Sequence, residues 1–191
     1  MDRPVKIVTP FWYLTFCVEK LSDVMYVPPW AYRDGVGVAG SVQRGPGAAM
    51  HYPTLSIAEL CDLDIKGIAD RDAVLFLWVT SPLLFECAEP VITAWGFEYK
   101  ASIVWNKDAH NMGHYVSVRH EFLLICTRGS ATPDTAERLA SVVTEQRTTH
   151  STKPERFREM IDAMYTHGKR IELFARREPP APWAAYGNEV L

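Results

Sequence analysis

The chain has 191 residues, of which 48% are hydrophobic and 23% are charged, and its formal net charge at pH 7 is −3. This composition excludes an intrinsically disordered chain, and the length fits a single domain, residues 1–191, with a hydrophobic core of its own. A slightly acidic chain is not a general binder of nucleic acid, so any such contact must come from a local patch.

The cysteines are scattered, at Cys17, Cys61, Cys87 and Cys126, and none of them forms a CxxC pair. Because this spacing does not fit a zinc site, we expect no bound metal. Scattered cysteines in a chain of this length predict reduced thiols in the core of a cytoplasmic protein, and a disulfide is the alternative.

An apolar run, KIVTPFWYLTFCV, lies near the start of the chain at residues 6–18. Pro10 interrupts the run, no small-residue cleavage site follows it, and it is too short to span a bilayer. We therefore expect a buried strand or a short helix there, and no association with membranes.

The next predicted element is a strand over residues 24–27, which ends at two prolines and a tryptophan. A loop over residues 31–53 follows, with five glycines between Gly35 and Gly47. Its GVGVAG stretch matches the glycine pattern of a nicotinamide-dinucleotide site, but no helix follows directly, as such a site requires. A loop of this length in a compact domain is often functional, so we interpret residues 31–53 as a mobile gate loop over a pocket.

Helices and strands then alternate along the chain. Ser56 and Glu59 form a capping box that begins a helix, and the continuous apolar run AVLFLWV (73–79) predicts a strand buried on both faces. Further helices are predicted at 82–95, with a kink at Pro90, and at 153–167, further strands at 97–105, 121–127 and 170–175, and an irregular segment at 128–152. This alternation predicts an α/β fold with a mostly parallel sheet flanked by helices.

The stretch VPPW, residues 27–30, has a specific chemical use. The exocyclic amine of adenine is a poor nucleophile because its lone pair is delocalised into the ring, and acceptors for its two hydrogens help to localise that pair. Two prolines free and orient a backbone carbonyl, since proline has no N–H and a fixed φ. Trp30 offers a face on which a base can stack. The alternative interpretation is a rigid exit from the strand with an apolar anchor.

Polar residues gather where several predicted strands begin or end. Trp105 and Lys107 lie at one strand end, Arg119 and His120 precede the next strand, and Glu172 lies near the end of the last. Open α/β sheets bind ligands at the carboxyl ends of their strands. Basic residues there can contact phosphate and an acid can accept ribose hydroxyls, whereas ordinary solvated side chains are the alternative at each position.

Eight motifs occur in one order along the chain: PPW, HYPTLS, LFLWVTSPLL, AWGFEYKASIVWNK, RHEFLLICTRG, HSTKPERF, RIELFARR and WAAYGNEV. Together they resemble the MT-A-type adenine methyltransferases over about residues 24–190. The resemblance implies a Rossmann-like methyltransferase fold in permuted order, with the PPW strand first and the cofactor-binding strand last. It also implies S-adenosylmethionine as the methyl donor, and DNA or RNA containing adenine as the acceptor.

The resemblance further implies three groups of site residues. The catalytic group is Pro28, Pro29 and Trp30, with Val27 at the position of the acid. The substrate-binding group joins Tyr52, which the resemblance implies, with the residues already singled out at the strand ends, Trp105, Lys107, Arg119 and His120. The cofactor-binding group is Lys153, Glu172, Phe174, Arg176, Asn188 and Glu189.

Two departures from the family pattern affect the predicted function. Val27 stands where the family has an aspartate, and residues 1–22 are not matched to the family. Valine cannot accept a hydrogen bond, and the loss of one preorganised partner in other enzymes lowers the rate on the order of 10²–10³-fold. The prediction is therefore an adenine-N6 methyltransferase. The alternative is a weakened or inactive relative that binds nucleic acid or a partner, and either a homodimer or a heterodimer is compatible with the sequence.

Overall fold

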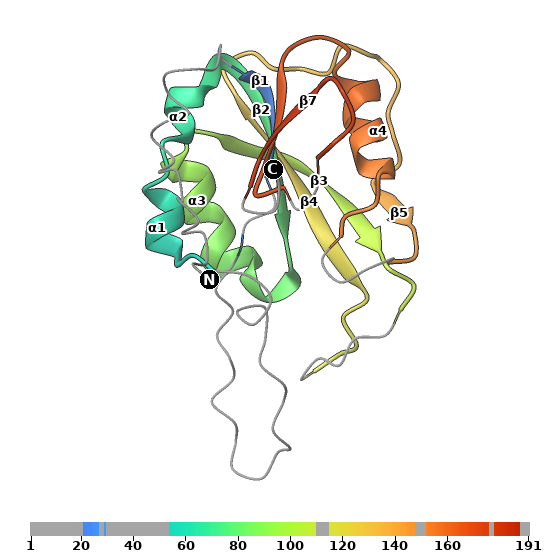
Figure 1. Cartoon of the computed structure of the whole chain (residues 1–191). Helices are drawn as coiled ribbons and strands as arrows, with labels where there is room; N and C mark the ends of the chain where they lie inside the picture. The colour runs from blue at the N-terminus through green and yellow to red at the C-terminus, as the bar shows by residue number, and fades with distance from the viewer. Residues whose placement is uncertain are drawn as a thin grey trace, which may run out of the picture.

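The computed structural model describes the backbone of residues 21–26, Pro29, and residues 54–109, 115–147, 152–175 and 178–187. Seven strands form one sheet in the order β5-β3-β4-β2-β1-β6-β7. Their bounds are β1 Leu21–Tyr26, β2 Ala69–Val79, β3 Glu98–Asn106, β4 His120–Arg128, β5 Val142–Thr144, β6 Arg170–Leu173 and β7 Trp183–Tyr186. Figure 1 shows this twisted sheet with helices on both of its sides.

The sheet is mixed. β4 pairs antiparallel with both β2 and β3, and these two ladders are the longest in the sheet, whereas the other pairings are parallel. The expectation of a mostly parallel sheet is therefore corrected. β3 and β4 are neighbours joined through residues 107–119, and an antiparallel pair needs no helical crossover. Because β2 and β3 both oppose β4, their carboxyl ends lie at the same edge as those of β1 and β6.

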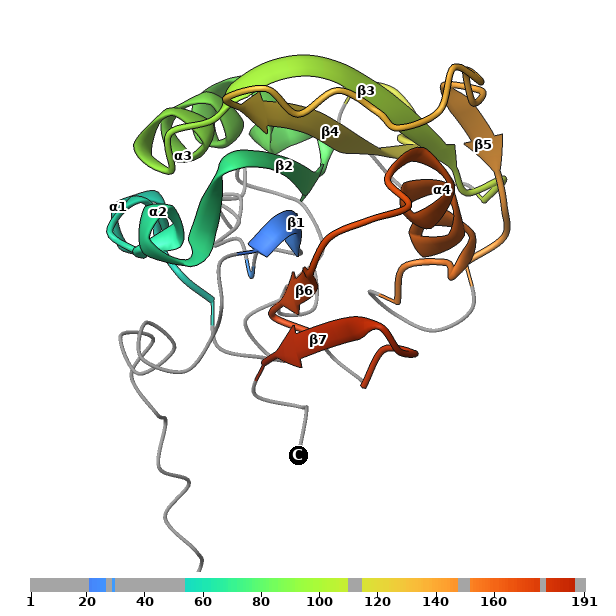
Figure 2. The same ribbon diagram turned by 90° about the horizontal axis from the view of Figure 1, so that it is seen from above.

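The helices are short and lie on opposite faces of the sheet. They are α1 Ile57–Cys61, α2 Ile65–Ile68, the 3₁₀ turn η3 Ser81–Leu83, the π turn η4 Leu84–Ala88, α3 Glu89–Ala94 and α4 Arg156–Met164. Figure 2 shows α1, α2 and α3 on one side of the sheet and α4 on the other. In the described part of the chain, no helix has the length and apolar character needed to cross a membrane.

Local sequence signals account for how these helices begin. The predicted capping box is confirmed, because Ser56 Oγ accepts from the Glu59 N–H while the Glu59 carboxylate accepts from the Ser56 N–H. Pro90 lies in the first turn of α3, directly after the π turn. Proline has no N–H to donate to the preceding turn, and the helix type changes from π to α beside it; the kink itself stays a prediction.

The core consists of two clusters, one on each face of β2. Leu75 and Leu77 point into the cluster beneath α1 to α3, whereas Phe76 and Trp78 point into the cluster beneath α4. Every residue from 73 to 79 is buried, which confirms the prediction from the continuous apolar run. β6 follows the same alternation: Ile171 and Leu173 join the first cluster, so its intervening residues face α4.

The described cysteines, Cys61, Cys87 and Cys126, are free thiols. β5 falls within residues 128–152, which were predicted to be irregular, and it extends the sheet beside β3 by three residue pairs.

Candidate functional site

The carboxyl ends of β1, β2, β3 and β6 lie at one edge of the sheet, and several described residues that were predicted for the site lie at or beside this edge. Trp105 is the penultimate residue of β3 and pairs with Glu121 of β4, while Lys107 follows β3 directly. Glu172 is the penultimate residue of β6, and Phe174 follows that strand. Open α/β sheets bind ligands at this type of edge.

Two lysines share one glutamate at this edge. Lys153 donates to Glu121 Oε2 at 2.5 Å, and Lys107 donates to Glu121 Oε1. The Glu121 side chain is only 11% exposed, and those of Lys107 and Lys153 are 18% and 12% exposed. Burial alone would raise the pKa of Glu121, but the two ammonium groups outweigh it and hold the pKa below its usual range. We refer to these three side chains as the lysine–glutamate cluster.

Tryptophan rings support the lysine–glutamate cluster. Lys153 Nζ lies 5.1 Å from the centre of the Trp78 ring and 5.8 Å from that of Trp105, and Lys107 Nζ lies 5.2 Å from Trp105. Trp105 Nε1 donates to the Glu145 carbonyl at 2.7 Å, which fixes the ring. Aromatic faces attract cations, so these rings stabilise two ammonium groups in a partly desolvated place.

Glu172 is held by a buried arginine. Arg158 of α4 donates from Nε at 2.9 Å and from Nη2 at 2.5 Å, and both hydrogen bonds end on Glu172 Oε2. Arg158 Nη1 donates to Glu155 Oε2 at 2.5 Å. The side chains of Arg158 and Glu172 are 5% and 6% exposed, so this is a buried ion pair at the end of β6.

The turn after β6 has an unusual backbone. Phe174 adopts a φ of 59°, a left-handed conformation that bulky residues rarely take. The next residue, Ala175, donates to the Tyr186 carbonyl at 3.1 Å, and a Cβ atom on Gly187 would lie 2.2 Å from the Ala175 carbonyl oxygen. Residues in such conformations cluster at ligand sites, because the surrounding structure must hold them there.

A family model described as MT-A70 matches residues 22–189, nearly the whole chain. The chain belongs to the MT-A70 family. This confirms the family that the motifs resemble. The family implies a methyltransferase fold, and the mixed sheet with helices on both faces is the part of that fold that the described residues contain.

Known relatives of this MT-A70 chain are named as methyltransferases. It is 36% identical over 188 residues to "Type II methyltransferase M.MunI" of Mycoplasma sp, covering 90% of this chain and 79% of that protein. It is 26% identical over 192 residues to the human "N(6)-adenosine-methyltransferase catalytic subunit METTL3", covering 90% of this chain but 33% of that protein. For the Arabidopsis thaliana "N(6)-adenosine-methyltransferase MT-A70-like", the identity is 26% over 170 residues, covering 82% of this chain and 24% of that protein. These names support an adenine methyltransferase.

Some predicted residues of the MT-A70 site are described with their contacts. Trp105 is 2% exposed, so its ring lies beneath the two lysines rather than at an open surface. Arg119 pairs with Asp108 at 2.6 Å, and the His120 ring packs against the edge of Phe122 at 4.9 Å. The predicted contacts of Trp105, Arg119 and His120 with substrate stay predictions. For Trp105, the contact that the structure supports is with the lysines.

Pro29 is the described residue of the VPPW stretch, and it is buried. Its carbonyl accepts from the Leu55 N–H at 2.9 Å, so this oxygen already has a partner within the protein. The carbonyl assigned to the adenine amine is that of Pro28. Other assigned positions also lie outside the described residues, namely Val27, Pro28, Trp30, the gate loop 31–53 with Tyr52, Arg176, Asn188 and Glu189.

Sequence reasoning missed two members of this site, Glu121 and Arg158. Glu121 is the second residue of β4, the residues after it are apolar, and it is 8% exposed although it is charged. Arg158 follows Phe157 and precedes Ile161 by three positions, so it borders the buried stripe of α4. A charged residue beside an apolar helical stripe was the available signal for Arg158. Among the described residues, no group of three or more potential metal ligands occurs.

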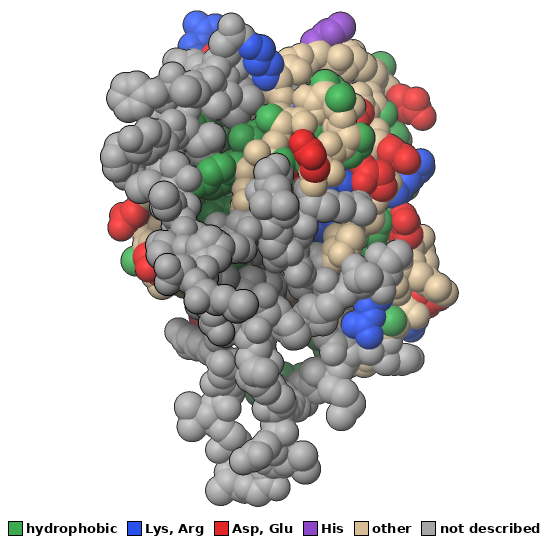
Figure 3. Space-filling view, in the orientation of Figure 1, with side chains coloured by type: hydrophobic (Ala, Val, Ile, Leu, Met, Phe, Trp, Pro, Cys, Tyr) green, Lys and Arg blue, Asp and Glu red, His purple; other side chains and the backbone are tan. Residues whose placement is uncertain are grey.

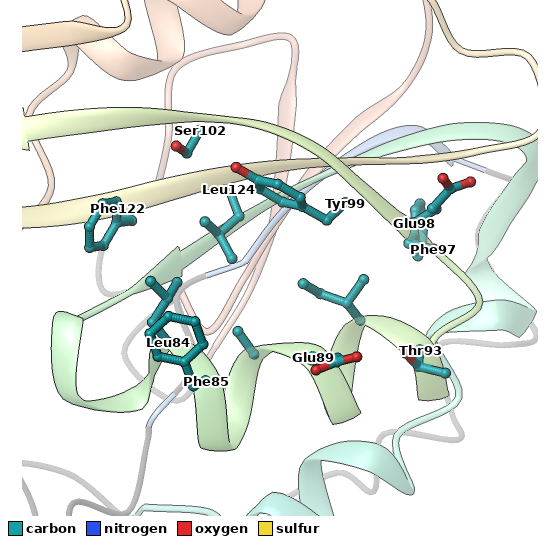
Figure 4. A pocket seen from close by; sticks show the side chains of 12 residues that line it. Leu84, Phe85, Glu89, Thr93, Phe97, Glu98, Tyr99, Ser102, Phe122 and Leu124 are labelled. Carbon is teal, nitrogen blue, oxygen red and sulfur yellow. The ribbon is translucent and has the colours of Figure 1, made fainter.

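A pocket of about 550 Å³ lies on the other face of the sheet, between η4 and α3 on one side and β3 and β4 on the other (Figure 4). Its lining residues include Phe85, Tyr99 and Phe122, and the acidic residues Glu89 and Glu98. Phe122 packs with the cluster under α3, whereas its neighbour Leu123 packs with the cluster under α4. The pocket is therefore on the opposite face from the lysine–glutamate cluster. The described residues assigned to the cofactor, Lys153, Glu172 and Phe174, do not line it.

Proposed function

We propose that this chain transfers the methyl group of S-adenosylmethionine to the exocyclic N6 amine of adenine in DNA or RNA. The observation that carries the proposal is the position of β1. Tyr26, its last residue, pairs with Leu77 of β2 on one side and with Leu173 of β6 on the other. β1, the strand that directly precedes the VPPW stretch in the sequence, therefore ends between the strand that carries Glu172 and the strand that carries Trp78, in the middle of the ligand-binding edge.

The described residues fit the chemistry of this cofactor. Glu172 offers a buried carboxylate at the end of β6, suited to accept hydrogen bonds from ribose hydroxyls. Lys153 offers an ammonium group at the same edge, suited to the carboxylate at the methionine end. Its bond to Glu121 holds this ammonium at the edge of the sheet. When bound, S-adenosylmethionine supplies an electrophilic methyl group on a sulfonium.

The remaining residues of the site act on the acceptor. The Pro28 carbonyl is assigned to one hydrogen of the adenine amine, and Trp30 to stacking on the base. Lys107 and Arg119, both at this edge, are assigned to the phosphate backbone. Figure 3 shows acidic and basic side chains interspersed on the described part of one face.

The second candidate function is a pseudo-methyltransferase that binds nucleic acid or a partner. The observation that favours it is Val27, which offers no acceptor for the second hydrogen of the amine. The two functions differ in their products, because the first yields N6-methyladenine and the second yields none.

The test combines calorimetry with methyl transfer. Binding of S-adenosylmethionine is measured for the wild type, for Lys153→Ala and for Lys100→Ala, an exposed lysine paired with Glu98 at 2.7 Å. Transfer is measured with adenine-containing DNA and RNA oligonucleotides, and with matched ones in which 2-aminopurine replaces adenine. We expect the wild type to bind S-adenosylmethionine, Lys153→Ala to weaken this binding, and Lys100→Ala to leave it unchanged. We expect the methyl group to be transferred only to oligonucleotides that contain adenine. Binding without transfer would select the second candidate, and absence of both would refute the proposed function.

A further inference from the structure

Arg158 and Glu172 bring a full ion pair into the interior of the protein. Their residues are 4% and 5% exposed, and they lie on different elements, α4 and β6. An uncompensated buried carboxylate is strongly disfavoured, so the guanidinium is what allows Glu172 to stay ionised in this place.

The contacts of Arg158 fix an orientation as well as a charge. The Nε and Nη2 groups of an arginine form a planar fork that often binds both oxygens of a carboxylate. Here both donors converge on Oε2, at 2.9 and 2.5 Å. Two bonds from one rigid group to the same oxygen fix the orientation of the Glu172 carboxylate.

The guanidinium is itself held in place from its other side. Nη1 donates to Glu155 Oε2 at 2.5 Å, and Glu155 immediately precedes α4. The neighbouring residues Phe157 and Ile161 are buried in the cluster under α4, which fixes the helix that carries Arg158 against the sheet. A planar donor fixed at both ends loses little further freedom when it orients its partner.

We propose that Arg158 is a positioning residue for cofactor recognition, which stabilises the ionised form of Glu172 and fixes the orientation in which this carboxylate meets the ribose hydroxyls. The proposal rests on the proposed function and deepens it. Arg158 does not touch the cofactor in this proposal. It sets how strongly the protein prefers a cofactor with intact ribose hydroxyls over one that lacks them.

The experiment compares two probes, S-adenosylhomocysteine and its 2′,3′-dideoxyribose analogue, by calorimetry at pH 7.5. Wild type should prefer the hydroxylated probe by about tenfold or more, since hydrogen bonds to a charged group are strong. Arg158→Met should lower the ratio of the two affinities towards one, because it should weaken binding of the hydroxylated probe alone. Arg158→Lys, which keeps the charge but not the fork, should give an intermediate preference.

The matched control is Arg156→Met, on the same helix, where the guanidinium pairs with Glu159 at 3.4 Å at the surface. It should leave the preference unchanged. Should Arg158→Met fail to fold, Glu172→Gln provides the same test from the other partner, because it removes the charge but keeps the side-chain size. Arg158→Lys offers a further folded form.

Each other result overturns the proposal. If Arg158→Met or Arg158→Lys weakened the binding of both probes equally, Arg158 would act only on the structure of the protein. The proposed function would then still stand. If the wild type bound the two probes equally well, Glu172 would not form hydrogen bonds with the ribose hydroxyls. Binding of neither probe by wild type would refute the proposed function together with this inference.

Discussion

Removal of the Glu121 charge should destabilise the protein strongly, because Glu121→Gln leaves Lys107 and Lys153 around a neutral amide. Breaking a buried ion pair by removing one partner costs about 3–5 kcal/mol. The side chains here are 11–18% exposed, and the contacts with the Trp105 ring persist at about 0.5–1 kcal/mol each. We expect a loss of about 2–4 kcal/mol in the free energy of unfolding at pH 7, or about 4–16 °C in Tm for a domain of this size.

Urea denaturation followed by tryptophan fluorescence measures this loss. The matched control is Glu159→Gln, which removes the acid of the surface pair with Arg156 and should change stability by at most about 0.5 kcal/mol. A second comparison replaces all three charged side chains of the cluster, as Lys107→Met, Glu121→Leu and Lys153→Met together. This triple variant should be more stable than Glu121→Gln, because no uncompensated charge remains.

The loss should also depend on pH, with a sign fixed by the lowered pKa of Glu121. A carboxylate whose pKa is lower in the folded state stabilises the protein fully above its unfolded pKa, and that stability disappears as the pH falls through the folded value. The difference between wild type and Glu121→Gln should therefore be constant from pH 6 to 8 and shrink below about pH 4.5, the ordinary pKa of a glutamate. A Glu121→Gln protein as stable as the Glu159→Gln control at pH 7 would refute the reasoning.

Three other substitutions or treatments have defined outcomes. Val27→Asp should raise single-turnover methylation of an adenine oligonucleotide on the order of 10²-fold with little change in cofactor affinity, and an equally fast wild type would show that another residue accepts the proton. Burial raises the pKa of Cys126 to about 12, and Cys61 is less buried, so a disulfide reagent at pH 8 should modify Cys61 before Cys126, as peptide mass spectrometry can test. Gly187→Ala should lower stability by about 1–3 kcal/mol because its Cβ would meet the Ala175 carbonyl, and an unchanged urea midpoint would contradict that clash.

The sequence predicted the parts of the fold that depend on neighbouring residues. The run at 73–79 predicted a buried strand, and Ser56 with Glu59 predicted a helix start, since both signals are complete within a few residues. The direction of β4 was not predictable in this way. It depends on which strand pairs with which, and residues 107–119 carry no clear signal for or against a crossover.

Sequence signals that extend over only a few neighbouring residues also explain why Glu121 and Arg158 were missed. Lys153 and Glu172 could be assigned from motifs, but their partners are distant in sequence. Lys153 meets Glu121 across 32 residues, and Arg158 meets Glu172 across 14. These pairs form because α4 packs on the face of the sheet where Trp78 and Trp105 lie, which is a property of the assembled core.

Both ion pairs bear on the choice between an enzyme and an inactive binding module. A buried ion pair is weak evidence for stability, because apolar residues of similar size in its place are often neutral or stabilising. A protein that used this domain only as a scaffold would therefore gain little from Arg158 with Glu172, or from two lysines around Glu121. Both groups lie at the edge where β1, β2, β3 and β6 end. Their charges are those that a cofactor with ribose hydroxyls and a carboxylate requires. We therefore expect the cofactor to bind with or without activity, and Val27 to limit the transfer step rather than the binding step.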